Sequence, residues 1–114
     1  MNAIFIELAV FQKYRPVYLS DESYCRLQQM LMEDPQKGDL IPDTGGLRKV
    51  RFRDERRHKG SRGGIRVIYY WLAGDGQFIL FTLYDKDQAD DLTKQQRDAL
   101  AKALMAIKQG LRND

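Results

Sequence analysis

The hydrophobic positions of the chain recur with two periods, and together they predict four strands and two helices. Short runs rich in Ile, Val, Phe and Tyr, bounded by Gly, Pro or charged residues, are typical of strands. They occur at residues 3–8, 47–53, 65–72 and 78–84. The third run, IRVIYYWL, is nearly continuous in apolar residues, so we expect it to be a central strand.

Helical spacing and capping residues define the two helices. The first should begin after Ser20 as N-cap and end before Pro35, which disfavours helix at the residue that precedes it. A capping box formed by Thr93 and Gln96 should begin the last helix, and Gly110 should end it. The apolar stripes of these helices are Tyr24, Leu27, Met30 and Leu31 in the first, and Leu100, Ala103, Leu104 and Ile107 in the last.

Three further segments connect these elements. Residues 9–18 mix aromatic and basic residues around Pro16, and we expect a short helical turn there. Residues 36–46 should form an ordered loop, in which Gly45 and Gly46 permit a positive φ before the next strand. The Thr44-Gly45-Gly46 sequence is also conceivable as a phosphate cradle, but it lacks the Lys-Ser/Thr that follows such loops in nucleotide sites. Residues 85–92 predict a short polar turn or helix.

The order of elements is strand, helix, three strands, helix, which predicts an α+β fold. We expect a mostly antiparallel four-stranded sheet with helices packed against one face. A chain of 114 residues is long enough for one core, so residues 1–114 should form a single domain.

The turn between the last two strands decides which side chains share a face. If Gly74, Asp75 and Gly76 form a three-residue loop, Ala73 pairs with Gln77. In that register the numbers of paired residues sum to 150, so Arg66 lies directly opposite Tyr84. A loop of two or four residues would put Tyr84 on the other face, and we choose the three-residue loop.

Composition adds few constraints. The single cysteine, Cys25, cannot form an intrachain disulfide, and no Cys/His cluster has metal-ligand spacing, so we expect no metal and no cofactor. The N-terminal apolar run is too short for a signal sequence, is broken by Glu7 and lacks a leading basic patch. No run approaches the roughly 20 apolar residues of a membrane span. We therefore expect a cytoplasmic protein that has no membrane partner.

Positive charge is concentrated in one region of the chain. Residues 48–66 contain nine of the 19 Lys and Arg residues but only two acids, Asp54 and Glu55. Their net charge of +7 contrasts with +3 for the whole chain, so the remaining residues sum to −4. Most of this charge falls on the second strand and on residues 53–64, which should be an exposed, mobile connection. Such asymmetry indicates a polyanionic partner.

The second strand separates its charged and apolar residues by face. Val50 and Phe52 fall on one face, and Lys49, Arg51 and Arg53 fall on the other. A strand that buries one face and lines the other with cations is suited to binding backbone phosphates. A solvated strand face would give the same pattern.

Arg66 lies within the expected central strand, where a charge is costly unless it is paired or faces a concave site. It is therefore either a functional residue or a structural ion-pair partner.

Several stretches of the chain resemble the RelE-type toxins of bacterial toxin–antitoxin pairs, and the HigB branch in particular. They are FIELAVFQKY, YLSDESYCRLQQMLMEDPQKGDLIPDTGGLRKVR, GGIRVIYY and FTLYDKDQADDLTKQQRDAL, and they cover almost the whole chain. The resemblance implies a small ribonuclease that cleaves mRNA in the ribosomal A site without a metal. It also implies neutralisation by a cognate antitoxin, usually a helix-turn-helix DNA-binding protein.

The resemblance also implies roles for individual residues. Lys49 and Arg51 would contact RNA phosphate, and Arg66 would stabilise the transition state. Tyr84 and Lys86 match the last active-site positions of the family. Arg48 and Arg53, which lie beside Lys49 and Arg51 on the second strand, complete the set of RNA-binding candidates.

Metal-free RNA cleavage requires three steps: removal of the 2′-hydroxyl proton, neutralisation of charge on the phosphate, and protonation of the 5′-oxygen. Arg66 meets the second requirement as a fixed bidentate cation. Tyr84 could donate or accept a proton only if neighbouring cations lower its pKa, as the cluster of Arg and Lys leads us to expect, and Lys86 is the other candidate. Some relatives use a histidine or an acid as the base, whereas His58 lies in the basic connection, so the base stays open.

A second class of function also fits these features. The protein could be a noncatalytic toxin or binding module that acts on DNA gyrase or on nucleic acid. The two classes differ in whether messages are cut.

Overall fold

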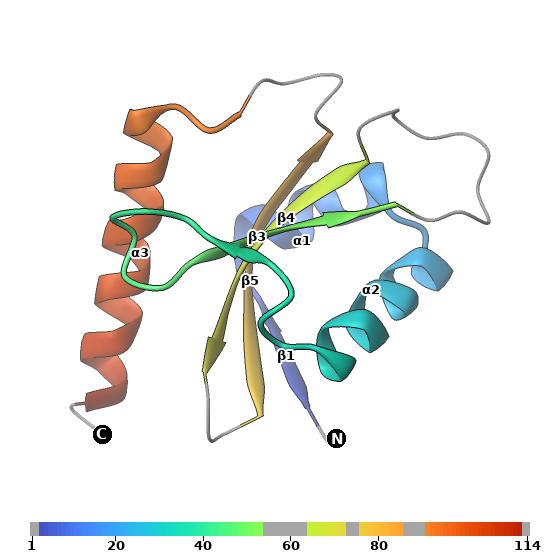
Figure 1. The fold of residues 1–114 in the computed structure, drawn as a ribbon, viewed down its shortest axis with the longest axis horizontal. Helices are drawn as coiled ribbons and strands as arrows, with labels where there is room; N and C mark the ends of the chain where they lie inside the picture. The colour runs from blue at the N-terminus through green and yellow to red at the C-terminus, as the bar shows by residue number, and fades with distance from the viewer. Residues whose placement is uncertain (1–2, 54–63, 73–75, 86–90, 113–114) are drawn as a thin grey trace.

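The computed structural model describes residues 3–53, 64–72, 76–85 and 91–112 (Figure 1). Within these residues the elements are, in chain order, β1 (Ile4–Glu7), α1 (Ala9–Tyr18), α2 (Asp21–Glu33), β2 (Asp39–Leu40), β3 (Arg48–Phe52), β4 (Ile65–Leu72), β5 (Gln77–Asp85) and α3 (Lys94–Arg112).

The strands form one mixed sheet in the order β1-β5-β4-β3-β2, with β4 at its centre. β1 runs parallel to β5, and the other neighbouring strands are antiparallel. The predicted α+β fold and the central position of residues 65–72 are confirmed. The prediction of four strands was wrong by one, because Asp39 and Leu40 form an additional strand, β2, that pairs with Lys49 and Arg48 of β3. A strand of two residues is too short to produce a period-two pattern in the sequence.

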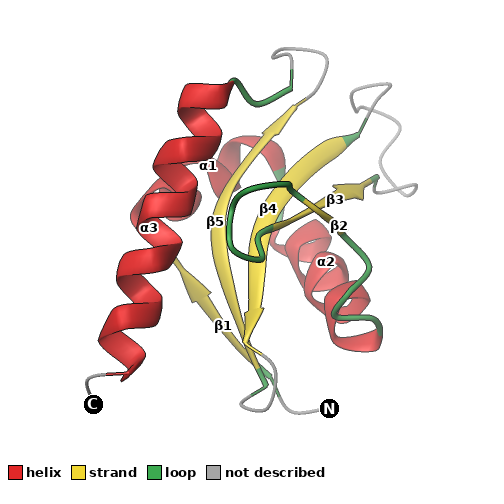
Figure 2. Cartoon of the chain, turned by 60° about the vertical axis from the view of Figure 1, so that its left-hand side comes forward, coloured by secondary structure: helices red, strands yellow, loops and turns green. Residues whose placement is uncertain are grey.

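Helices cover both faces of the sheet, whereas we expected them on one (Figure 2). Phe11 of α1 and Leu27 of α2 pack in one core with Val67. Leu104 of α3 packs in a second core with Ile68, the next residue of β4. Because adjacent residues of β4 are apolar on both faces, each face must be covered. We call the face of Ile68 the α3 face and the opposite one the α1/α2 face.

Residues 9–18 form a ten-residue helix, and the expected short turn was wrong. Pro16 lies inside this helix and cannot donate a hydrogen bond to the carbonyl of Gln12. The fully buried Phe11 anchors the helix in the core, and this tertiary packing outweighs the local cost of the proline.

Both predicted N-termini are confirmed by their hydrogen bonds. The Ser20 hydroxyl accepts from the Ser23 N–H at 3.1 Å, as expected of the N-cap of α2. The Thr93 N–H donates to Gln96 Oε1 at 2.9 Å, and the Gln96 N–H donates to Thr93 Oγ1 at 3.1 Å, which is a capping box. The predicted C-terminus was wrong, since α3 continues through Gly110 to Arg112.

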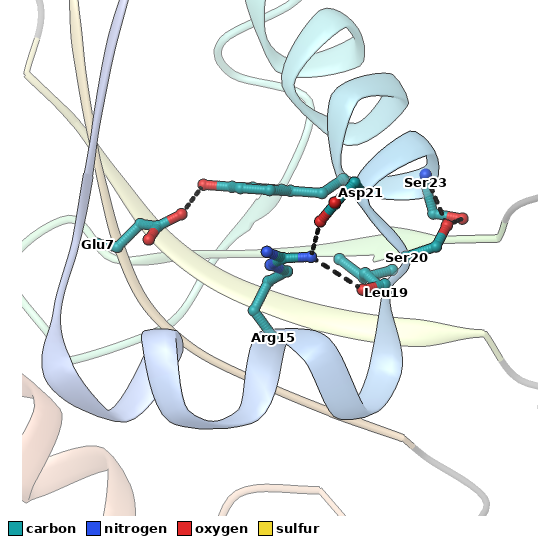
Figure 3. A network of polar contacts seen from close by, with 7 residues as sticks. Glu7, Arg15, Leu19, Ser20, Asp21 and Ser23 are labelled. Atoms are coloured by element: carbon teal, nitrogen blue, oxygen red, sulfur yellow. Dashed lines mark hydrogen bonds and ion pairs between the residues drawn. The ribbon is translucent and has the colours of Figure 1, made fainter.

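Arg15 joins α1 to the start of α2 (Figure 3). Its Nη1 donates to the Leu19 carbonyl at 3.2 Å and to Asp21 Oδ1 at 2.8 Å. Its guanidinium also lies over the Tyr24 ring, 5.2 Å from the ring centroid. The Tyr24 hydroxyl in turn donates to the Glu7 carboxylate of β1. This network fixes the two helices and the edge strand relative to one another.

Arg66 lies opposite Tyr84 as predicted, but the turn differs from the one we expected. Leu72, and not Ala73, pairs with Gln77. This register on its own would place Tyr84 on the face opposite to Arg66.

A β-bulge restores the predicted face. Ile68 pairs with Thr82, whereas the next residue, Tyr69, pairs with Leu80. Phe81 is therefore an extra residue on β5, and beyond it each β5 residue moves to the other face. The bulge brings Tyr84 back to the α3 face beside Arg66.

The glycines before β3 have a backbone role. Gly45 and Gly46 have φ values of 80° and 122°, which other residues rarely adopt. The buried Thr44 hydroxyl donates to the Ile41 carbonyl at 2.7 Å and accepts from the Leu47 N–H at 3.2 Å. These bonds close the turn, so the interpretation of the glycines as turn residues is confirmed.

Some predictions lie outside the described residues. They concern the connection at residues 54–63 with His58, the hairpin tip at 73–75, and most of the polar turn, with Lys86. In the part of the chain that is described, no helix has the length and apolar character needed to cross a membrane.

Candidate functional site

The candidate site is built on the α3 face of three adjacent strands, β3, β4 and β5. The alternation predicted for β3 is confirmed, since Val50 and Phe52 are buried in the core of the α1/α2 face. Lys49 and Arg51 therefore point to the α3 face. The Arg66 side chain points to the same face, because Arg51 pairs directly with Arg66 across the antiparallel β3–β4 ladder.

One row of paired residues crosses the three strands: Arg51 on β3, Arg66 on β4 and Tyr84 on β5. Directly opposed residues of an antiparallel pair have their Cβ atoms roughly 5 Å apart. The row thus concentrates two guanidinium groups and a phenol at one point of the sheet.

Arg66 is only 5% exposed, while Arg51 is exposed. The Arg66 Nη1 donates to the Gly64 carbonyl at 3.4 Å, and this residue makes further contacts. Arg66 is thus held in place by its surroundings and also faces Arg51 and Tyr84. Both roles left open by the sequence, a structural one and a position in the candidate site, are compatible with this placement.

A carboxylate that the sequence did not single out lies among these groups. Both oxygens of Asp91 contact Lys49 Nζ, at 2.9 and 3.1 Å. The Tyr84 hydroxyl donates to Asp91 Oδ1 at 3.2 Å. Asp91 therefore connects the cation of β3 with the phenol of β5.

Burial raises the pKa of Tyr84 to about 12, and the charge of Asp91 and its hydrogen bond contribute. The charge of Arg66 acts in the opposite direction but is outweighed. We expected neighbouring cations to lower this pKa, and that expectation was wrong. The nearby carboxylate and the loss of solvent favour the neutral phenol more strongly than the cations favour the phenolate. The phenol of Tyr84 is thus neutral at neutral pH.

The pKa of Asp91 is lowered from its ordinary value, chiefly by its hydrogen bond with Lys49. Asp91 is therefore a carboxylate at neutral pH. The only local signal for it was its position just before the capping box of α3. Its contact with Lys49 joins residues 42 positions apart, which no local spacing reveals.

The remaining sequence candidates lie apart from this cluster or outside the described residues. Arg48 precedes Lys49 and pairs with Tyr69, so it points away from the α3 face. Its Nη1 donates to the carbonyls of Gly38 at 2.7 Å and Gln36 at 3.3 Å. Arg53 is exposed directly after β3.

Lys86 is not among the described residues, and its role stays a prediction. Where the structure is described, no three His, Cys, Asp or Glu residues gather as a metal ion would require.

Comparison with known proteins defines the fold. No protein-family model matches the chain. A chain of the intact E. coli RelBE toxin–antitoxin complex aligns with a TM-score of 0.51 and 11% identity, over 74% of this chain and 96% of that chain. A double arginine mutant of E. coli toxin RelE in the free state aligns with a TM-score of 0.51 and 12% identity, over 79% of this chain and 90% of that chain.

At this level of identity the likeness establishes the fold alone. The chain has the fold of the RelE toxins, as the sequence resemblance implied. The HigB branch stays a prediction.

Proposed function

We propose that this protein is a ribosome-dependent endoribonuclease toxin that cleaves mRNA without a metal and arrests translation. The observation that carries the proposal is the row of Arg51, Arg66 and Tyr84, with Lys49 beside it, on one face of the sheet. The RelE fold supports it, because one solved structure with this fold is described as a toxin.

The cations would act on the scissile phosphate. Arg66 would stabilise the charge that develops in the transition state, since its guanidinium is planar, permanently charged and held by its surroundings. Arg51 and Lys49 would bind the RNA backbone on either side of that phosphate. Arg53 extends this surface beyond the end of β3. Arg48 is left out of the proposed RNA-binding set because it faces the other way.

Tyr84 would act as a general acid. With a pKa of about 12, it keeps its proton at neutral pH and can donate it to the departing 5′-oxygen, which is far more basic. Lys86, two residues further along the chain, is our candidate for the second proton-transfer group. Neither residue is a strong base at neutral pH in its ordinary state.

Such a weak acid–base set fits an enzyme that relies on the ribosome. Holding the reacting groups in the correct geometry can lower a barrier by about 7–11 kcal/mol in favourable cases. The ribosome would provide that geometry by fixing the message, so that the protein supplies charge and a proton donor.

A cognate antitoxin is the expected partner. The fold is shared with a chain of a toxin–antitoxin complex, and an exposed cationic surface suits an acidic or helical segment of a partner. We propose that this antitoxin is a helix-turn-helix DNA-binding protein and that both act in the cytoplasm.

Inducing the protein in growing bacteria tests this function. Pulse labelling of protein synthesis should fall first, and primer extension should reveal cut transcripts. Arg66→Ala should abolish both effects, whereas Arg97→Ala on α3 should retain them, with thermal melting used to verify that each variant folds. Early DNA damage with intact transcripts would instead favour the gyrase-directed alternative.

A further inference from the structure

We infer that the Asp91 carboxylate occupies an RNA phosphate subsite between Lys49 and Tyr84, and that RNA binds there by displacing it. The inference rests on the proposed function, because it takes the α3 face as the surface that receives RNA.

The position of Asp91 suggests this role. It lies between β5 and α3, three residues before α3 begins. Lys49 and Tyr84, which it contacts, belong to the strands on either side of β4. Strand spacing places the backbones of those two strands about 10 Å apart. One carboxylate thus contacts side chains from both of the strands that flank the central strand.

The contacts of Asp91 are those that a phosphodiester would make. It presents two oxygens and one negative charge to the Lys49 ammonium, at 2.9 and 3.1 Å. It accepts a hydrogen bond from the neutral Tyr84 hydroxyl at 3.2 Å. A phosphodiester also carries two free oxygens and one charge, and Lys binds it as a point charge. Because like charges repel, the carboxylate and an RNA phosphate cannot share this point.

Asp91 is also held weakly enough to be displaced. Its side chain is 65% exposed, whereas that of Lys49 is 29% exposed. Ion pairs with this exposure contribute little to stability. Among the described residues, its other hydrogen bond comes from the Leu92 N–H, at 3.0 Å. Displacement would therefore free Lys49 and Tyr84 without disturbing the core.

Asp91→Asn is the direct test. The amide keeps an oxygen for the hydrogen bonds from Tyr84 and the Leu92 N–H but loses the charge that holds Lys49. Asp98→Asn is a matched control, because Asp98 also forms an exposed ion pair with a lysine, Lys94 at 3.3 Å, within α3. Both substitutions change the net charge of the protein equally.

Binding is measured by fluorescence anisotropy with a labelled single-stranded RNA in which every 2′-hydroxyl is methylated, so that cleavage cannot occur. One additional phosphate contact steepens the salt dependence of binding by about 0.7 logarithmic units per tenfold change in salt. D91N should therefore bind about fivefold more tightly than wild type at roughly 0.1 M salt, with this steeper slope. D98N should change the affinity less than about twofold, because its charge lies outside the subsite.

The gain should depend on the freed lysine. Adding Lys49→Ala to D91N should remove the increase in affinity and return the salt slope to that of wild type. Equal affinities for D91N and D98N would overturn the inference. The same holds if neither variant binds the RNA detectably. A gain that persists when Lys49 is replaced would also overturn it.

These outcomes are independent of the proposed cleavage. Message cleavage by wild type together with an unchanged D91N affinity would reject the subsite and leave the nuclease proposal intact. Intact messages together with the Lys49-dependent gain would reject the nuclease and leave a phosphate subsite of a noncatalytic protein.

Discussion

Arg66 and Tyr84 lie directly opposite each other on β4 and β5, and both face the α3 side of the sheet. The two residues also interact electrostatically, since the charge of Arg66 favours the ionised form of the Tyr84 phenol. Burial and the Asp91 carboxylate oppose that effect and keep the phenol neutral. The pair therefore consists of a buried cation beside a neutral phenol.

Arg66→Lys should lower message cleavage by about 100-fold or more, because lysine keeps the charge but loses the planar bidentate donor set. The measurement is the rate at which purified protein cuts ribosome-bound mRNA. Lysine at this 5% exposed position retains a cation and most of the side-chain volume, so thermal melting should detect a folded protein. A folded Arg66→Lys variant with wild-type activity would remove Arg66 from the proposed mechanism.

Tyr84 should remain protonated at about pH 10.5, where an ordinary tyrosine is mostly ionised. In D91N its pKa should fall from about 12 toward the ordinary value of 10.0, because the charge of Asp91, one of the causes that raise it, is removed. The raised pKa stabilises the fold below about pH 10, and this contribution is lost as pH rises toward 12.

Titration of ¹³Cζ-labelled tyrosine by NMR measures this pKa in both proteins. Ionisation of Tyr84 at or below pH 10 in wild type, or the same pKa in D91N, would contradict the assignment.

Tyr69→Phe should lower the free energy of unfolding by about 2 kcal/mol, since it leaves the buried Gly38 N–H and the half-buried Pro35 carbonyl without their partner. The Tyr69 hydroxyl donates to the Pro35 carbonyl at 2.8 Å and accepts from the Gly38 N–H at 3.0 Å. Tyr70→Phe on the same strand is the control and should cost less than about 0.5 kcal/mol, because phenylalanine keeps the ring that packs on the core and lies under Lys108. Urea denaturation that gives equal losses would refute the role of the Tyr69 hydroxyl.

Arg15→Ala should destabilise the protein by about 1 kcal/mol, because it removes a hydrogen bond to the Leu19 carbonyl and the contact with the Tyr24 ring. Lys13→Ala is the matched control: its ammonium also lies over a ring, that of Tyr14 at 5.4 Å, and within the described part of the chain this contact stays inside α1. Urea titrations should show the larger loss for Arg15. A loss for Lys13→Ala as large as that for Arg15→Ala would show that the link between α1 and α2 contributes nothing measurable.

Features written in consecutive residues could be predicted from the sequence. The caps at Ser20 and Thr93 depend on hydrogen bonds three residues away, so their partners are visible in the chain itself. The alternation around Val50 likewise defined both faces of β3. The resemblance to the RelE-type toxins also predicted the fold, and the likeness to the solved structures confirms that prediction.

Features that depend on tertiary contacts were missed. β2 exists through its pairing with β3, and α1 persists despite Pro16 because Phe11 is buried. The Phe81 bulge depends on how β5 aligns with β4. It offset our error in the turn, so the predicted pairing of Arg66 and Tyr84 held for a reason that the sequence did not reveal. Asp91 likewise belongs to the site through its contact with Lys49, 42 positions earlier in the chain.

The most direct test of the nuclease proposal is cleavage of a defined mRNA on purified translating ribosomes, read by primer extension. Wild-type protein should cut the message at the ribosome-occupied codon, should leave it intact without ribosomes, and should lose this activity on Arg66→Lys substitution. Intact ribosome-bound messages in the presence of folded wild-type protein would contradict the central claim.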